Sequence, residues 1–142
     1  MDVHVTTSAV RGTTRAPPSK SYTHRALLAA GYSAGATVRS PLVSADTKAT
    51  ARAVTAFGGA VEPASGEGFD GADALVGDGF GGRPAVPDDV IDCANAGTTM
   101  RLVTAAAALA DGTTVLTGDG SLRSRPQGAL LTALADLGVH AE

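Results

Sequence analysis

Two stretches of the sequence decide its fold: residues 24–30 read His-Arg-Ala-Leu-Leu-Ala-Ala, and residues 100–106 read Met-Arg-Leu-Val-Thr-Ala-Ala. In both stretches an arginine opens an apolar run that is typical of a helix. A glycine turn and a short β-prone stretch follow each run, at residues 35–38 (Gly-Ala-Thr-Val) and 112–115 (Gly-Thr-Thr-Val). The recurrence of this order predicts two copies of one supersecondary unit.

Each copy then passes through a polar loop into a second helix, expected over residues 45–57 in the first copy and 126–137 in the second. Pro126 suits the first position of a helix, where its missing N–H costs nothing. Gly58 and Gly138 stand where left-handed helix caps are expected. Matching positions of the two copies lie about 76 to 80 residues apart. A strand start follows each capping glycine, so each unit is expected to have the order β-α-β-α-β.

The helix expected over residues 97–110 is apolar nearly all round. Such a helix is typically buried on every side, which predicts helices inside the protein and a sheet that faces outward. The stretch from residue 63 to residue 89 is rich in Gly, Pro and Asp and is expected to join the copies through turns and short strands. The sequence therefore predicts an α/β fold of repeated units with buried helices, and no boundary between independent domains.

Composition excludes several classes of protein. A net charge of -3 over 142 residues argues against a nucleic-acid surface, which needs a basic face. No apolar run approaches the roughly 20 residues that span a bilayer, and the opening residues lack the pattern of a signal peptide. Cys93 is the single cysteine, which favours a reducing compartment. We expect a soluble cytoplasmic protein, with no nucleic acid or membrane as partner.

The first candidate site lies at the start of the helix that carries Lys20, Ser21 and Arg25. Free N–H groups and the positive end of the dipole make a helix N-terminus attractive to anions. An ammonium, a hydroxyl and a guanidinium beside it could hold a phosphate or carboxylate. An ordinary capped helix with solvated charges explains the same residues equally well. A P-loop is excluded, because Ser19 replaces the glycine that should precede the lysine.

A second candidate site lies at the matching helix start of the other copy, residues 92–101. Small residues there allow a ligand to approach the backbone, and Asn95 and Thr98 can supply hydrogen bonds. Gly97 serves either this approach or helix packing, and Arg101 is interpreted as a structural ion-pair partner. Arg125 precedes the next helix and offers another anion contact. The sequence contains no metal-binding motif.

Four motifs together resemble the EPSP synthase (5-enolpyruvylshikimate-3-phosphate synthase) family. They are Pro-x-Ser-Lys-Ser-x-x-x-Arg-Ala-Leu (17–27), Ser-x-Asp-Thr (44–47), Asn-Ala-Gly-Thr-x-x-Arg (95–101) and Leu-Thr-Gly-Asp-x-x-Leu-x-x-Arg-Pro (116–126). They occur in the family's order and cover nearly the whole chain. The resemblance implies the enolpyruvyl transferase-like inverse α/β fold, in which two similar domains each contain three β-α-β-α-β-β units.

The resemblance also implies how the chain is divided. Residues 1–16 would form a first strand that belongs to the other, C-terminal domain. Residues 17–142 would form an incomplete first domain with two units, about 17–90 and 91–142. Because members of the family are much longer, this chain by itself is expected to be an inactive fragment, and the remaining substrate contacts are expected beyond Glu142.

The implied reaction joins phosphoenolpyruvate to the 5-hydroxyl of shikimate 3-phosphate and releases phosphate, in a monomeric enzyme without a metal or cofactor. Lys20 would be the catalytic residue and would contact both substrates. Shikimate 3-phosphate would be held by Lys20, Ser21 and Arg25. Phosphoenolpyruvate, at a position where glyphosate also binds, would be held by Lys20, Asn95, Gly97, Thr98 and Arg125.

Two alternatives stay open on the residues alone. The sister enolpyruvyl transferase that acts on UDP-N-acetylglucosamine shares the fold, but it usually carries Lys-Asn where Lys20 and Ser21 stand and lacks the arginine at position 25. A non-catalytic phosphate-binding module could use the repeat by itself. The chain departs from the family at Pro18, His24 and Leu102, and the last two bear on sensitivity to glyphosate.

Overall fold

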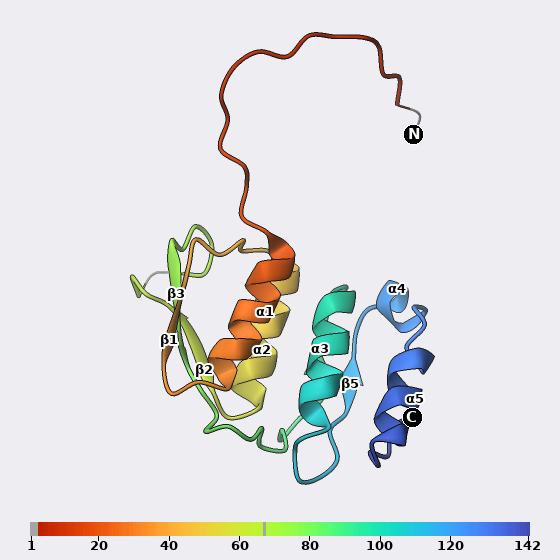
Figure 1. The fold of residues 1–142 in the computed structure, drawn as a ribbon. Coiled ribbons are helices and arrows are strands. Elements are labelled where there is room, and N and C mark those ends of the chain that lie inside the picture. The colour runs from red at the N-terminus through yellow and green to blue at the C-terminus, as the bar shows by residue number, and fades with distance from the viewer. Residues whose placement is uncertain (1–2, 67) are drawn as a thin grey trace.

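The first copy of the repeat forms a three-stranded sheet covered by two helices in the computed structural model, which describes residues 3–66 and 68–142. Its elements are α1 (Lys20–Gly31), β1 (Ala36–Arg39), α2 (Ala45–Ala56), β2 (Ala60–Pro63) and β3 (Ala74–Asp78). The strand order is β1-β3-β2, and β3 runs antiparallel to both neighbours. Figure 1 shows this sheet at one side of the molecule, with α1 and α2 against one of its faces. The predicted outward-facing sheet with helices inside is therefore confirmed for this copy.

The second copy repeats the order of the first through its two helices. Its elements are β4 (Ile91–Asp92), α3 (Gly97–Ala107), β5 (Leu116–Thr117), the short α4 (Gly120–Arg123) and α5 (Gly128–Asp136). The strands β4 and β5 pair in parallel, with Ile91 opposite Leu116. Parallel strands need a crossover between them, and α3 is that crossover. Thus α1, β1 and α2 of the first copy correspond to α3, β5 and α5 of the second.

Side-chain caps explain where the first two helices begin. Ser19 precedes α1, and its hydroxyl accepts a hydrogen bond from the N–H of Tyr22. Ser44 precedes α2 and forms a reciprocal capping box with Thr47. Such caps satisfy N–H groups that have no partner inside the helix. In contrast, α3 begins after Ala96, which offers no side-chain cap.

The core consists of two adjoining clusters, and α2 contributes to both. One cluster places Ala53 and Phe57 against Val103 of α3. The other places Val54 against Leu27 of α1 and the inner face of the sheet. Because α1, α2 and α3 each pack on the other two, packing holds the starts of α1 and α3 at the same end of the molecule, as Figure 1 shows.

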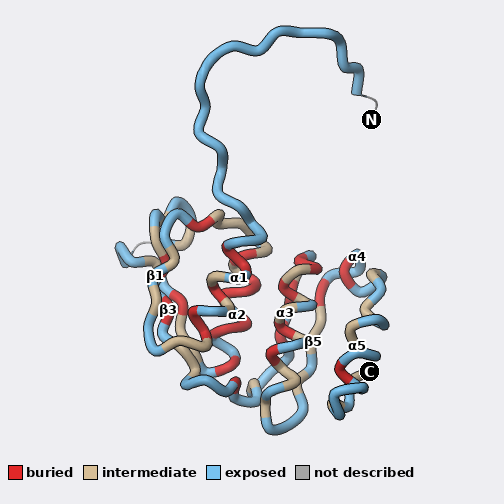
Figure 2. Tube along the Cα trace, in the orientation of Figure 1, coloured by how far each residue is buried: buried red, intermediate tan, exposed pale blue. Residues whose placement is uncertain are grey.

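Two expectations about the second copy are wrong. The helix α3 is not buried on every side: Arg101 and Ala105 are exposed, and Figure 2 shows one face of this helix open to solvent. The described elements that pack on α3 are mainly α1, α2 and β5, and they cover only part of its surface. Residues 139–140 form no strand, because no described strand pairs with them.

The segment before α1 leaves the body of the protein. Residues 3–16 are exposed and form neither helix nor strand, and they extend away from the helices in Figure 1. The first two residues of the expected first strand lie outside the described residues. A strand requires a neighbouring strand for its hydrogen bonds, and no described strand pairs with this segment. The assignment of residues 1–16 to another domain stays a prediction.

Candidate functional site

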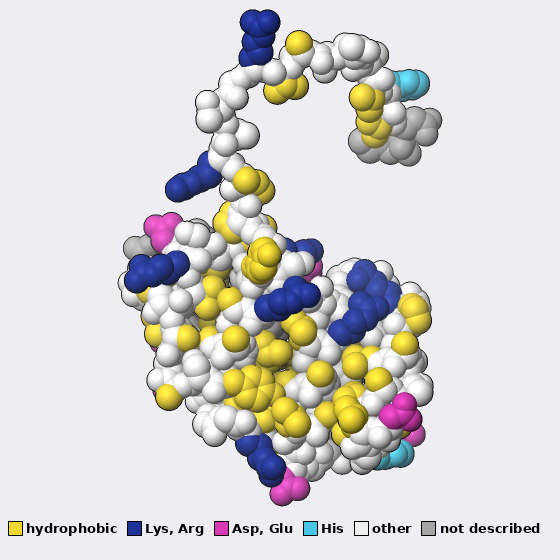
Figure 3. Space-filling model, viewed as in Figure 1, with side chains coloured by type: hydrophobic (Ala, Val, Ile, Leu, Met, Phe, Trp, Pro, Cys, Tyr) yellow, Lys and Arg dark blue, Asp and Glu magenta, His cyan; other side chains and the backbone are white. Residues whose placement is uncertain are grey.

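A cavity of about 460 Å³ lies where α1 and α3 begin. Lysine and arginine side chains gather at this end of the molecule in the space-filling view of Figure 3. The lining residues come from both copies of the repeat, and most of them are polar or charged. They are Lys20, His24, Asp46, Asn95, Ala96, Gly97, Thr98, Arg101 and Arg125. Three cations around one small cavity make it suited to a phosphate or carboxylate.

The structure brings together one of the two residue sets expected from the sequence. Lys20 and the four residues assigned to phosphoenolpyruvate all line this cavity. Ser21 and Arg25 do not, although they follow closely on the same helix. Neighbouring positions of a helix do not face the same way, and the Arg25 guanidinium donates to the Ser21 carbonyl oxygen at 2.9 Å on the exposed side. Ser21 and Arg25 therefore lie on a face of α1 next to the one that carries Lys20, and Lys20 is on the cavity side.

Lys20 already has a partner in this structure. Its Nζ lies 2.7 Å from Oδ2 of Asp46, in the first turn of α2. Asp46 was not among the site residues expected from the sequence; Ser44 caps that helix, and the Asp46 side chain lines the cavity. The Ser-x-Asp-Thr motif was the signal that could have singled it out. An anion that binds Lys20 must compete with this carboxylate.

Arg125 is held by a network that starts from Asp119. The Asp119 side chain accepts from the Leu122 N–H at 2.8 Å and so caps α4, and its other oxygen accepts from Asn95 at 2.7 Å. These hydrogen bonds, with the backbone N–H of Leu122 first, lower the pKa of Asp119. The side-chain oxygen Oδ1 of Asn95 in turn accepts a hydrogen bond from Arg125. Asn95 thus links the start of α3 to the loop that carries Arg125.

Gly97, the first residue of α3, lies directly beneath the two arginines of the cavity. A Cβ atom at this position would lie 3.1 Å from Nη1 of Arg125 and 3.3 Å from Nη1 of Arg101. Both distances are tighter than ordinary contact, and both neighbours are the ends of flexible side chains. With no side-chain cap from Ala96, the first N–H groups of α3 are available as donors to an anion.

The interpretation of Arg101 as an ion-pair partner is wrong. Among the described residues it forms no salt bridge, and its Nη2 donates to the Pro126 carbonyl oxygen at 3.5 Å. Arg101 lies one turn after Gly97 on the same face of α3, because positions four apart are neighbours on a helix. That position places it in the wall of the cavity.

His24 is a buried polar residue that sequence reasoning did not assign to the site. Its Nδ1 lies 2.7 Å from the hydroxyl of Thr50, which lies 2.7 Å from the hydroxyl of Thr99. The Thr99 hydroxyl donates onward to the Asp46 carbonyl oxygen at 3.3 Å. This chain joins α1, α2 and α3 directly below the cavity. No motif in the sequence could have shown it, because its members are far apart along the chain.

Comparison with known proteins agrees with the four motifs. The sequence model of EPSP synthase (3-phosphoshikimate 1-carboxyvinyltransferase) matches residues 5–142. The chain belongs to the EPSP synthase family. The 3-phosphoshikimate 1-carboxyvinyltransferases of Halorubrum lacusprofundi and Natronomonas pharaonis are 89% and 65% identical to it over 142 residues. These matches cover 100% of this chain and 31% of each relative, so the chain spans about a third of the length of these family members.

The fold agrees with a solved structure of the family. The EPSP synthase of Acinetobacter baumannii superposes with a TM-score of 0.78 at 26% identity, over 91% of this chain and 28% of the other. The predicted enolpyruvyl transferase-like α/β fold is therefore confirmed. Within the described residues, no helix is both long and apolar enough to cross a membrane.

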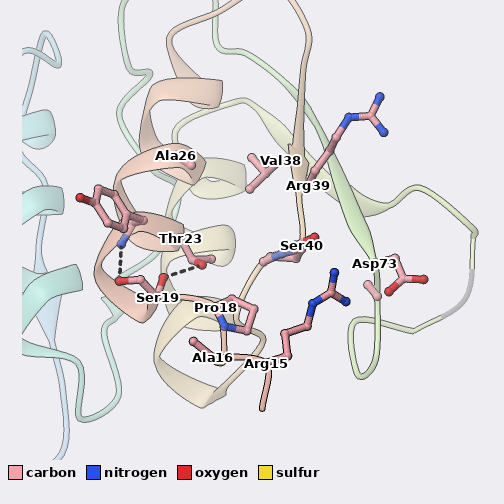
Figure 4. Close-up of a pocket in the computed structure, with 13 residues that line it drawn as sticks. Arg15, Ala16, Pro18, Ser19, Thr23, Ala26, Val38, Arg39, Ser40 and Asp73 are labelled. Carbon is pink, nitrogen blue, oxygen red and sulfur yellow. Dashed lines mark hydrogen bonds between the residues drawn. The ribbon is translucent and has the colours of Figure 1, made fainter. Parts of the chain in front are cut away.

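A second cavity lies on the opposite side of α1 and has a volume of about 510 Å³. It is bounded by β1, the start of α1 and the segment before it, and its lining includes Arg15, Arg39 and Asp73. Figure 4 shows that the Arg39 guanidinium points away from the other side chains drawn. None of the residues that the sequence singled out for catalysis or binding lines it. The cation-lined cavity is therefore the better candidate site of this family member.

Proposed function

We propose that this protein transfers the enolpyruvyl group of phosphoenolpyruvate to the 5-hydroxyl of shikimate 3-phosphate, giving EPSP and phosphate. The observation that supports this most directly is the meeting of Lys20, Arg125 and the uncapped start of α3 in one cavity. The family to which the chain belongs supports the choice of these two substrates.

The cations of the cavity suit phosphoenolpyruvate, which carries a phosphate and a carboxylate. Arg125 and the first N–H groups of α3 are the proposed contacts for this anion, together with Asn95 and Thr98. Gly97 leaves room for the anion at the backbone. Donors fixed before the ligand arrives need no rearrangement during the reaction, which is how charge developing in an adduct is stabilised.

Shikimate 3-phosphate is proposed to lie on the neighbouring face of α1, where Ser21 and Arg25 are exposed. Lys20 lies on the cavity side of α1 and is half exposed, so its flexible side chain can reach an anion on either face. Bringing two anions together is opposed by their mutual repulsion, and one ammonium between them offsets it. Lys20 is therefore the proposed catalytic residue of this chain.

Other properties of the proposal rest on composition and family. The protein is proposed to act in the cytoplasm as a monomer, without a metal or an organic cofactor. Among the described residues, no three His, Cys, Asp or Glu side chains come together as a group that could hold a metal ion.

Ligand titration of the ¹⁵N-labelled chain tests the substrates. Phosphoenolpyruvate should shift the amide signals of Gly97 and Thr98, and shikimate 3-phosphate those of Lys20 and Ser21. UDP-N-acetylglucosamine, the substrate of the sister enzymes, should shift neither set. If it saturates the site, the sister activity is the correct assignment. If inorganic phosphate binds as tightly as both substrates, the chain is a general phosphate-binding module and the proposed activity is wrong.

A further inference from the structure

The floor of the cation-lined cavity contains a titratable group that the proposed reaction does not use. His24 lines this cavity, yet its side chain is only 1% exposed. Its Nδ1 is occupied by the hydroxyl of Thr50, whereas its Nε2 is buried and has no hydrogen-bond partner among the described residues. A buried polar atom without a partner normally costs about 1–3 kcal/mol. The edge of the ring opposite Thr50 thus has no hydrogen-bond partner among the described residues, in a side chain that lines the cavity where an anion would arrive.

The charged groups that act on this ring are Lys20 and Arg25 of α1 and Asp46 of α2. Arg101 of α3 and Arg125 of the loop before α5 line the same cavity. Burial is the largest influence and lowers the pKa of His24, and Lys20 and Arg25 lower it further, whereas Asp46 raises it. While Lys20 remains 2.7 Å from Asp46, it neutralises the one carboxylate that favours a proton on the ring. The ring is neutral in this arrangement at pH 7.

Binding of an anion raises the pKa of His24 in two ways. The anion attracts Lys20, so the ammonium moves away from Asp46 and leaves the carboxylate without its partner. The anion also adds negative charge a short distance from the ring. An opposite charge within a few ångström favours the protonated form of a histidine. The carboxylate of Asp46 and the bound anion then both stabilise a charged His24.

The hydrogen bonds below the ring can accommodate this proton. In the neutral ring with hydrogen on Nε2, Nδ1 accepts from Thr50. In the charged ring Nδ1 donates, so Thr50 must turn its hydroxyl toward Thr99. Thr99 then donates to the Asp46 carbonyl oxygen, which lies 3.3 Å away. Every hydroxyl in the chain retains an acceptor, and no buried proton on that side is left unpaired.

We propose that His24 is a charge-compensating residue of the cavity, neutral while Lys20 is paired with Asp46 and protonated from solvent when an anion draws Lys20 away. The proposal rests on the proposed function, because it requires an anion at Lys20. It goes further by coupling anion binding to the uptake of a proton. The site thereby gains an additional positive charge only when a negative charge is present.

Sulfate is a suitable probe, because it remains a dianion through the neutral range and brings no proton of its own. Calorimetric titrations of the 142-residue chain at a fixed pH between 5.5 and 7, in buffers of different ionisation enthalpy, measure protons taken up per sulfate. Because the bound anion raises the pKa of His24, a fraction of a proton should be taken up per sulfate, and the uptake should be largest at a pH between the pKa values of the free and the sulfate-bound protein. Ring signals followed by NMR with and without sulfate should show His24 titrating at higher pH in its presence.

Two variants identify the group that takes up the proton. His24→Asn retains an amide beside Thr50 but cannot titrate in this range, so the uptake should be lost. His140→Asn makes the same change at an exposed histidine remote from the cavity and should leave the uptake as in the wild type. If His24→Asn does not fold, the NMR titration of the wild-type ring decides alone.

The outcomes separate this inference from the proposed function. Sulfate binding without proton uptake, or with uptake retained in His24→Asn, overturns the role of His24 and leaves the anion site intact. If sulfate, phosphoenolpyruvate and shikimate 3-phosphate all fail to bind, the role of His24 and the proposed function are both wrong. Uptake that is lost only in His24→Asn supports the coupling.

Discussion

Substitution of Gly97 by alanine tests the cation-lined cavity most directly. The new methyl group would lie 3.1 Å from the Arg125 guanidinium and 3.3 Å from that of Arg101. Both guanidinium groups must therefore shift by a few tenths of an ångström, and the methyl group itself enters the space where an anion would meet the start of α3. A hydrogen bond to a charged group contributes about 1.5–3 kcal/mol. Partial loss of one such contact corresponds to about a tenfold weaker affinity for phosphoenolpyruvate.

The same substitution should leave the fold intact. The close neighbours are ends of flexible side chains, and no backbone atom outside the helix lies among them. Alanine is a better helix former than glycine by up to about 1 kcal/mol. We therefore expect an unchanged or slightly raised melting temperature. Affinity for shikimate 3-phosphate should change little, because its proposed contacts lie on the exposed face of α1.

The assay combines ligand titration with a melting curve. Gly128→Ala is the matched control, because Gly128 is also the first residue of a helix and a Cβ there meets no atom within 4 Å. This control should bind phosphoenolpyruvate as the wild type does. A Gly97→Ala protein that melts several degrees lower and binds both substrates more weakly by the same factor would refute the reasoning, since Gly97 would then serve helix packing.

Three further predictions follow from single contacts. Lys20→Ala should abolish measurable binding of phosphoenolpyruvate. Lys48→Ala should have no effect on it, because Lys48 pairs with the exposed Asp70 and is not among the residues that line the cavity; equal affinities of the two variants would contradict the site. Burial lowers the pKa of His24 below 6.5, so its stabilising contribution is complete above pH 6.5 and is lost as the pH falls through the lowered value. Urea unfolding should show this loss in the wild type and not in His24→Asn, and parallel curves would disprove it. Burial raises the pKa of the Cys93 thiol to about 11, so a thiol reagent at pH 8 should label it only as fast as the protein unfolds, and rapid labelling of the native state would show the thiol to be accessible.

The repeat was predictable because its signals are local. Helix starts follow from serine caps, glycine turns and the apolar periodicity of each run, and these depend on residues only a few positions apart. The same local signals placed Lys20 and Gly97 at the starts of α1 and α3. Once a matching helix was predicted in each copy of the repeat, the meeting of the two helix starts needed only that the copies pack side by side.

Which side chains meet across helices was decided by tertiary structure. His24 and Thr99 are 75 residues apart in sequence, and their contact depends on how far α1, α2 and α3 rotate about their axes as the core packs. The same rotation turns Lys20 toward Asp46 and the cavity, and turns Ser21 and Arg25 to the outer face. The periodicity of a helix fixes which residues share a face, but the packing of its neighbours determines what that face meets. The sequence by itself therefore determined the units, the helix starts and the family, whereas the partner of Lys20, the role of Arg101 and the buried position of His24 were decided only by the folded arrangement.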